Sequence, residues 1–234
     1  MDLTLFYSLC QPISDDSFML NSYTRLPIYG FHEVRLATLA TIAEYLKQAN
    51  VPPNQHFVKR LDKWQTIVVI PHIIQSRVVQ IICRSVNEKA FQLLHSGISF
   101  PFGIGCFRPE TKYLDPIICV EGALDLYALR LVLPQANIVA SLSAGMSRLQ
   151  FDILCGIGHN FILAYDSDDA GRRACFTERK KLQSLGKNVI LLNHPSAFKD
   201  PGDLFSVLND PFQSNLHIQY YRNQYQIFCR QCFY

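Results

Sequence analysis

Two aspartates separated by a single residue stand where an apolar run of the sequence ends. Residues 161–165 are apolar and β-forming, and Asp166, Ser167 and Asp168 follow at once. An apolar run bounded by turn residues predicts a buried strand, and open α/β sheets bind ligands at the carboxyl ends of their strands. Asp166 and Asp168 would therefore both face one point at that end, which suits a hard divalent metal ion.

A second acidic segment follows the apolar run 117–120. Glu121 comes directly after this run, Gly122 allows a sharp turn, and Asp125 lies one helical turn after Glu121. The helix dipole favours an acid in the first turn of a helix, so Asp125 taken alone also fits a structural role. The segment predicts a strand that ends at Glu121 and passes into a helix.

A third acidic segment, KDPGDL at 199–204, follows the apolar run 188–192 by a short loop. It contains Asp200 and Asp203, and Asp203 taken alone also fits a helix N-cap. If the predicted strands are parallel, all three acidic segments meet at one edge of the sheet. The carboxylates gathered there would be those of Glu121, Asp125, Asp166, Asp168, Asp200 and Asp203.

So many carboxylates in one cleft would raise one another's pKa values and destabilise the fold unless cations neutralised them. Mg²⁺ takes oxygen ligands and keeps several waters for a phosphate substrate, so one or more Mg²⁺ ions explain the cluster economically. A single DxD motif is common in loops, and Asp169 fits a cap or a solvated face. Three acidic segments at successive strand ends are a far more specific signal, and they predict a metal site.

The elements that must carry these segments alternate along the chain. Strands are predicted at 117–120, 138–141, 161–165 and 188–192, and helices at 124–133, 147–154, 170–185 and 203–208. This alternation predicts a mostly parallel sheet with helices on its faces. Gly186 suits the C′ position that ends the third helix. We expect an α/β catalytic domain over residues 115–208 and a tail without clear periodicity over 209–234.

The first half of the chain has a different pattern. Residues 1–27 are irregular, and apolar residues at three- and four-residue spacing predict a helix over 33–46. Residues 64–74 and 77–86 are β-like and separated by two residues, which predicts a hairpin or a meander. We expect a small α+β subdomain over residues 1–114.

The composition is that of a globular protein, since 49% of the residues are hydrophobic and 18% are charged. A net charge of +3 is too small to indicate nucleic acid by itself. We see no secretory signal or membrane span, and the eight scattered cysteines fit reduced thiols, so we expect a cytoplasmic protein. Cys229 and Cys232 lack a second pair, which favours a structural or fortuitous role over metal binding.

The three acidic segments resemble the motifs of a known domain. EGALDLYAL at 121–129, AYDSDDAGRRA at 164–174 and KDPGDL at 199–204 are similar to those of the Toprim domain. Primases, topoisomerases and some nucleases share this domain, and the form seen here looks most like that of DnaG-type and phage primases. The segment 140–145, ASLSAG, is similar to a short loop that primases place between the first two motifs.

The resemblance implies a Toprim fold and a DNA primase-like nucleotidyltransferase that makes short RNA primers on single-stranded DNA. A ribonucleotide 3′-hydroxyl would attack the α-phosphate of a nucleoside triphosphate, and pyrophosphate would leave. Bound Mg²⁺ or Mn²⁺ would neutralise the triphosphate and orient the displacement. Glu121 would be either a ligand or the group that accepts the hydroxyl proton. The remaining implied ligands are Asp125, Asp166, Asp168 and Asp200 or Asp203.

Weaker similarity upstream, at 67–71, 78–84 and 112–114, resembles the strand pair and basic subdomain that hold the template in primases. Template binding needs cations for phosphates and aromatic faces for unstacked bases. The candidate nucleotide- or nucleic-acid-binding residues are Arg77, Arg84, Lys112, Arg172 and Lys199. The further basic residues of the third predicted helix fit a solvated face equally well. A replicative helicase is a further partner that the resemblance suggests.

Other functions remain open at this point. The same metals would serve a nuclease in which Glu121 acts on water, and a repurposed primase core could bind DNA without catalysis. The sequence has no CxxC…CxxC zinc set, which such primases carry before the core, and no GxxxxGK[ST], so we expect no helicase motor in it. A topoisomerase is disfavoured because no tyrosine stands in a recognisable catalytic context. By analogy, a lone primase core fits a bacterium, phage, plasmid or other mobile element.

Overall fold

The computed structural model describes residues 2–12, 35–50, 63–64, 66–86, 90–95, 99–108, 113–207 and 210–232. The chain forms two compact units, Met1–Ser99 and Phe100–Tyr234, each with its own sheet. The division lies earlier than the boundary expected after residue 114. The reason is that the backbone of Phe102 pairs with that of Ala140, which joins the connecting segment to the second unit.

The first unit is built on an antiparallel sheet with the strand order β1-β2-β3-β4-β5. Its elements are α1 (Leu3–Leu9), β1 (Gln11–Pro12), β2 (Arg35–Thr38), α2 (Leu39–Gln48), β3 (Thr66–Ile74), β4 (Arg77–Ser85) and β5 (Phe91–His95). The predicted hairpin is confirmed in β3 and β4. Gln75 and Ser76 between them have φ angles of 48° and 63°, and positive φ at both central residues is what a tight turn between twisted strands requires.

Two predictions for this unit are wrong. The helix predicted over 33–46 begins only at Leu39, because β2 pairs with β3 and Ala37 is fully buried in the sheet. Residues 3–9, expected to be irregular, form α1, whose Phe6 packs edge-on against Tyr45 of α2. The rest of the segment predicted to be irregular, from residue 13, lies outside the described residues.

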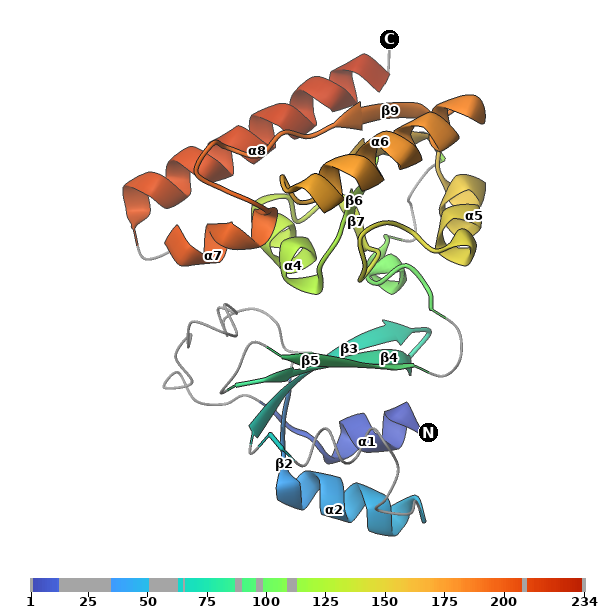
Figure 1. Cartoon of the computed structure of the whole chain (residues 1–234), viewed down its shortest axis with the longest axis vertical. Helices are drawn as coiled ribbons and strands as arrows, with labels where there is room; N and C mark the ends of the chain where they lie inside the picture. The colour runs from blue at the N-terminus through green and yellow to red at the C-terminus, as the bar shows by residue number, and fades with distance from the viewer. Residues whose placement is uncertain are drawn as a thin grey trace. The chain divides into compact units, whose positions relative to one another are not determined.

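The second unit, drawn in Figure 1, contains a parallel sheet. Its strand order is β7-β6-β8-β9. Its strands are β6 (Ile117–Val120), β7 (Asn137–Ala140), β8 (Asn160–Leu163) and β9 (Asn188–Leu191). Its helices are η1 (Ile104–Cys106), α4 (Ala123–Val132), α5 (Arg148–Ile157), α6 (Asp169–Ser184), η2 (Pro201–Asp203), α7 (Leu204–Val207) and α8 (Pro211–Cys232). The predicted alternation of strands and helices and the parallel sheet are confirmed, with small shifts at the ends of the elements.

Helices cover this sheet on both faces, so its strands are apolar throughout. Every residue of β6, β7 and β8 is buried. Ile117 and Cys119 of β6 pack with Leu154 of α5 and Leu182 of α6 on one face. The alternate residues point to the opposite face, where α4 packs on β6 and β7 and α8 contacts α4. All four strands therefore present their carboxyl ends to one edge.

The segment expected to be a C-terminal tail forms the long helix α8. Its buried residues recur at helical spacing: Ser214, His217, Tyr221 and Phe228. Because two of these four positions are polar, the apolar period is not visible in the sequence. The ring of His217 stacks on that of Phe198 with 3.9 Å between centroids, so α8 holds the segment that follows β9. Among the described helices, none combines the length and apolar character that crossing a bilayer needs.

Candidate active site

Glu121 directly follows β6 and reaches toward the end of β8. Its Oε1 accepts the backbone N–H of Asp166 at 3.2 Å. Burial raises the pKa of the Glu121 carboxyl to about 7, and the charge of Asp166 adds to this effect. A carboxyl with such a pKa can accept or release a proton near neutral pH.

The first turn of α6 lies unusually close to this carboxyl. A Cβ atom on Gly171 would lie 2.2 Å from the carbonyl oxygen of Asp166 and 2.6 Å from Oε1 of Glu121. Only glycine therefore fits at the position where α6 meets the acidic edge.

Asp168 is the N-cap of α6. Its Oδ1 accepts the backbone N–H groups of Ala170 and Gly171, each at 3.0 Å. The bond from Gly171, and after it the ammonium of Lys199, lower the pKa of the Asp168 carboxyl. One oxygen of Asp168 thus orders the helix, while the other faces Lys199.

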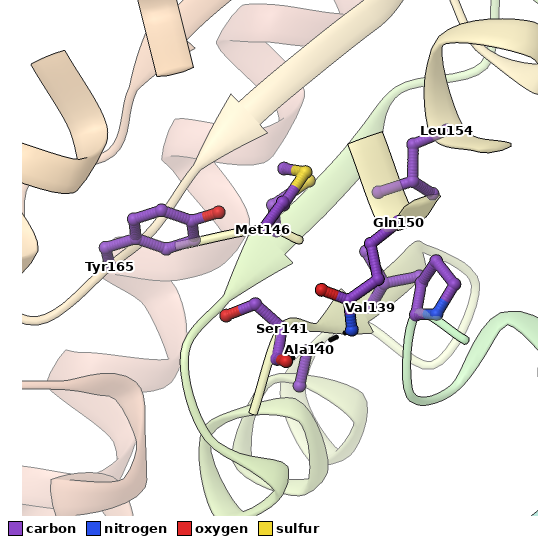
Figure 2. Close-up of a pocket in the computed structure, with 9 residues that line it drawn as sticks. Val139, Ala140, Ser141, Met146, Gln150, Leu154 and Tyr165 are labelled. Carbon is purple, nitrogen blue, oxygen red and sulfur yellow. Dashed lines mark hydrogen bonds between the residues drawn. The ribbon is translucent and has the colours of Figure 1, made fainter. Parts of the chain in front are cut away.

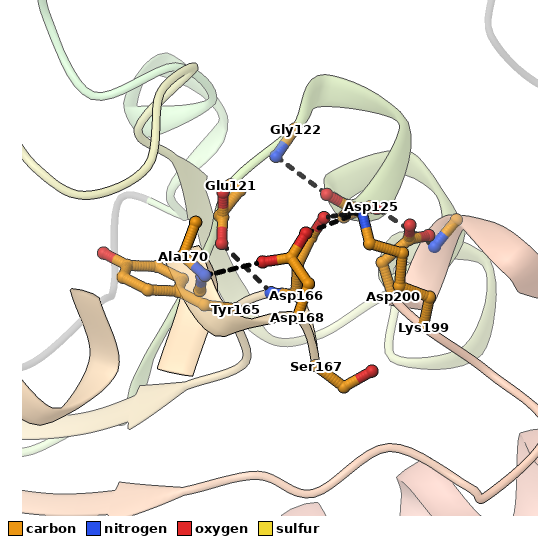
Figure 3. A network of polar contacts seen from close by, with 12 residues as sticks. Glu121, Gly122, Asp125, Tyr165, Asp166, Ser167, Asp168, Ala170, Lys199 and Asp200 are labelled. Atoms are coloured by element: carbon orange, nitrogen blue, oxygen red, sulfur yellow. Dashed lines mark hydrogen bonds and ion pairs between the residues drawn. The ribbon is translucent and has the colours of Figure 1, made fainter. Parts of the chain in front are cut away.

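Lys199 joins the second and third acidic segments (Figure 3). Its Nζ lies 2.7 Å from Oδ2 of Asp166 and 3.1 Å from Oδ2 of Asp168. Its carbonyl oxygen also accepts the backbone N–H of Ser167 at 2.8 Å. The bond to Asp166 is the main cause that raises the pKa of the Lys199 ammonium, which therefore stays charged.

Asp125 joins the first and third segments. It is buried, with 6% of its surface exposed, and both its oxygens are bonded to backbone. Oδ2 accepts the N–H of Gly122 at 2.7 Å, and Oδ1 accepts the N–H of Gly202 at 3.0 Å. Burial raises the pKa of Asp125 well above its usual value, and the charges of Asp200 and Asp166 raise it further. In this arrangement Asp125 fixes the two segments against each other.

Asp200 and Asp203 order the third segment itself. Oδ1 of Asp200 accepts the N–H of Asp203 at 3.1 Å, so Asp200, rather than Asp203, is the N-cap of η2. Oδ2 of Asp203 accepts the backbone N–H of Lys199 at 2.8 Å. These bonds close the turn that presents the Lys199 side chain to Asp166.

The three acidic segments therefore meet at one edge of the sheet, as their positions after successive strands predict. Within the part of the chain that the structure describes, no three His, Cys, Asp or Glu side chains are grouped so that they could hold a metal ion. Instead, the carboxylate oxygens are bonded to Lys199 and to backbone N–H groups. The atoms available as metal ligands are carboxylate oxygens, which carry negative charge. Hard divalent cations prefer ligands of this type.

Comparisons with known proteins find a match over the part of the chain that carries these segments. Residues 118–205 match a family model described as Toprim-like. The chain carries a Toprim-like domain. Over 99 residues, 42% of this chain, it is 34% identical to the DNA primase of Thermotoga maritima, of whose length it spans only 17%.

Solved structures show the same fold beyond the Toprim-like domain. The zinc-binding and RNA polymerase domains of the Aquifex aeolicus primase superpose with a TM-score of 0.60 at 22% identity, covering 85% of this chain and 53% of that one. A DnaG primase catalytic domain bound to single-stranded DNA superposes with a TM-score of 0.61 at 16% identity, covering 92% and 78% of the two chains. The chain thus has the fold of primase catalytic cores.

The basic residues predicted to bind nucleotide or nucleic acid lie in different environments. Lys199 lies inside the acidic cluster of the Toprim-like domain. Arg172 turns its guanidinium to the carboxylate of Asp169, 2.6 Å away, and to the carbonyl of Ser167. Arg77 is exposed and Arg84 partly buried, both on β4 of the first unit. Lys112 lies outside the described residues.

A buried carboxylate that the sequence analysis missed supports the Toprim-like domain behind its acidic edge. Glu178 of α6, with 5% exposed surface, accepts the hydroxyl of Tyr165 and the backbone N–H of Met146. Burial raises its pKa. Glu178 lies four residues before the buried Leu182, so both are on the apolar face of the predicted helix. An acid on that face is the sequence signal that could have indicated a buried carboxylate.

The loop after β7 is hydrogen-bonded to α5. Gln150 donates from Nε2 to the carbonyl of Ser141 at 3.1 Å, and Figure 2 shows these two residues with Met146 and Tyr165 around a small pocket. The side chains fill this pocket so closely that no water fits in it. The loop similar to that of primases therefore lies beside Tyr165, the residue that precedes Asp166, and is bonded to α5.

His194 supports the same residue from the other side. Its Nε2 lies 2.8 Å from the carbonyl oxygen of Tyr165, and its Nδ1 lies 3.3 Å from the hydroxyl of Tyr221 on α8. A carbonyl can only accept, so Nε2 carries the proton and Nδ1 accepts from Tyr221. Burial lowers the pKa of His194, which favours this neutral ring.

Proposed function

We propose that this chain is a primase-type nucleotidyltransferase that joins ribonucleotides on a single-stranded DNA template. The observation that carries the proposal is the meeting of Glu121, Asp166 and Asp168 at the carboxyl edge of the parallel sheet. The Toprim-like domain and the similarity in fold to primase catalytic cores support it. A replicative helicase is a further partner that this function suggests.

The carboxylates at this edge of the sheet would have two roles, metal binding and positioning of the segments. Asp166, Asp168 and Asp200 would hold Mg²⁺ or Mn²⁺, which when bound would neutralise the triphosphate and align it for displacement. Asp125, both of whose oxygens are bonded to backbone N–H groups, would position the first and third segments. Asp203, whose Oδ2 accepts the backbone N–H of Lys199, would position Lys199.

Two residues act through charge and proton transfer. Glu121, with a pKa of about 7, is suited to accept the proton of the attacking 3′-hydroxyl at neutral pH. Lys199 would keep Asp166 and Asp168 ionised and together before a metal ion binds. Because it is a cation beside the phosphate site, it could then contact the nucleotide.

The test is a gel assay with the full chain, a single-stranded DNA template, labelled ribonucleoside triphosphates and Mg²⁺ or Mn²⁺. We expect short products that require both template and metal, and none from Asp166→Ala or Glu121→Gln with folding intact. Asp169→Asn, a change to an exposed carboxylate beside the cluster, is the control and should leave synthesis intact. Full activity in either site variant contradicts the assignment, and cleavage of labelled nucleic acid without nucleotides indicates a nuclease.

One observation favours a second function, that of a DNA-binding module without catalysis. Lys199 already pairs with Asp166 and Asp168, so it offsets part of their charge without a metal ion. Such a module would bind single-stranded DNA equally well in EDTA and would incorporate no nucleotides.

A further inference from the structure

The exposed face of α6 carries an aromatic ring surrounded by cations. Phe176 lies near the middle of the helix with 58% of its surface exposed. Positions three and four residues away on a helix are its neighbours on the surface. Those neighbours are Arg172, Arg173, Arg179 and Lys180, all exposed.

Acidic residues do not neutralise most of this face. The carboxylates of α6 are Asp169, in its first turn, and the buried Glu178. Arg172 is paired with Asp169. Among the described residues, no carboxylate lies within ion-pair distance of Arg173, Arg179 or Lys180. The Nζ of Lys180 lies 4.3 Å from the centre of the Phe176 ring. The face therefore combines uncompensated positive charge with an accessible aromatic ring.

We propose that this face of α6 is a docking surface for single-stranded DNA. Phosphates would contact Arg173, Arg179 and Lys180, and one unstacked base would stack on Phe176. The charge is complementary to a polyanion, and stacking requires a base that is not paired in a duplex.

The direction of α6 links this surface to the acidic edge. The helix begins after its N-cap Asp168, and Phe176 lies about 12 Å further along the helix axis. A strand lying on the face would therefore lead toward Glu121 and Asp166. Only this second step rests on the proposed function, because binding to α6 requires neither metal nor nucleotide.

The experiment measures binding of a dye-labelled oligothymidylate to the full chain in EDTA by fluorescence anisotropy at several salt concentrations. We expect Phe176→Ala to weaken binding by about tenfold or more, and Phe176→Trp to retain it. Arg173→Glu should weaken binding and make the salt dependence shallower, by about 0.7 in logarithmic slope for each phosphate that the variant no longer binds. The matched controls Phe212→Ala, at an exposed phenylalanine of α8, and Arg148→Glu, at an exposed arginine of α5, should bind as the wild type does.

Three results would overturn the proposal: no binding by the wild type at low salt, equal affinity of Phe176→Ala and wild type, or equal loss in the controls. Competition by polyglutamate as strong as that by unlabelled oligothymidylate, with no effect of Phe176→Ala, would point instead to an acidic protein partner. All these variants change exposed side chains, and their melting temperatures check that they fold. If the oligonucleotide binds through α6 but the wild type makes no primers, the docking surface stands and the proposed polymerase activity falls.

Discussion

The ammonium nitrogen of Lys199 lies 2.7 Å from Oδ2 of Asp166, although the two residues belong to different acidic segments of the sequence. The same nitrogen is 3.1 Å from Oδ2 of Asp168. One side chain of the third segment therefore holds the second segment together by charge. A divalent ion at this point would have to replace or share this cation.

Replacing Lys199 by Met tests that relationship. The variant keeps the length of the side chain but leaves Asp166 and Asp168 without their counter-charge, so its melting temperature in EDTA should fall. Mn²⁺ should then stabilise Lys199→Met more than it stabilises the wild type, because no ammonium competes for the carboxylates. Lys180→Met, on the exposed face of α6, is the control and should respond to Mn²⁺ as the wild type does. An equal response of Lys199→Met and wild type would show that the ion binds elsewhere.

The pKa of Glu121 predicts a pH dependence of stability. The folded state raises this pKa from 4.5 to about 7, so between these values the folded protein binds more protons at Glu121 than the unfolded chain does. Stability contributed at this residue therefore falls as the pH rises through that window. In EDTA, Glu121→Gln should melt a few degrees above the wild type at pH 8 and at the same temperature at pH 4.

Differential scanning fluorimetry across this pH range measures the effect. The control, Asp169→Asn, changes a carboxylate whose side chain is 79% exposed, and it should show no such pH-dependent gain. A Glu121→Gln variant that is less stable than the wild type at pH 8 would mean that the ionised carboxylate stabilises the fold.

The glycine at the start of α6 predicts a steric effect. In Gly171→Ala the added Cβ would meet the carbonyl of Asp166 at 2.2 Å, and backbone cannot move aside cheaply. We expect a loss of about 2 kcal/mol or more in the free energy of unfolding. Gly156→Ala, in α5, adds a Cβ with nothing within 4 Å and should be neutral or gain up to about 1 kcal/mol. Urea denaturation compares the two, and similar stabilities would contradict the close approach of α6 to the site.

The buried bond between Glu178 and Tyr165 predicts coupling between the two residues. Glu178→Gln and Tyr165→Phe should each destabilise the fold, because each leaves a buried polar group without its partner. The double variant should lose about 1–2 kcal/mol less than the sum of the two. A double-mutant cycle from urea denaturation measures this, and strictly additive losses would mean that the bond contributes nothing.

The sequence predicts the meeting of the acidic segments well because strand ends are local features. The apolar run before Asp166 is followed at once by aspartates, and the apolar run before Glu121 is followed by Glu121 and then Gly122. Once the alternation of strand and helix predicts a parallel sheet, both ends must share one edge. No side-chain geometry is needed for this inference.

The partners of the carboxylates could not be predicted in the same way. Asp125 accepts the N–H of Gly202, a hydrogen bond between residues 77 positions apart. Such bonds depend on the path of a loop, which residue types do not fix. The helix α8 was missed for a related reason. His217 and Ser214 occupy buried positions that an apolar pattern would have marked, and only packing against the rest of the unit makes them part of the core.

The proposed active site requires that carboxylates of separate segments share divalent ions. Crystals of the full chain soaked with Mn²⁺ and a ribonucleoside triphosphate would reveal the ions by anomalous scattering. We expect a peak at Asp166, Asp168 and Asp200, beside Glu121, with the Lys199 ammonium displaced from at least one carboxylate. A structure in which Lys199 keeps both bonds, and Mn²⁺ appears only away from these residues, would contradict the proposed active site.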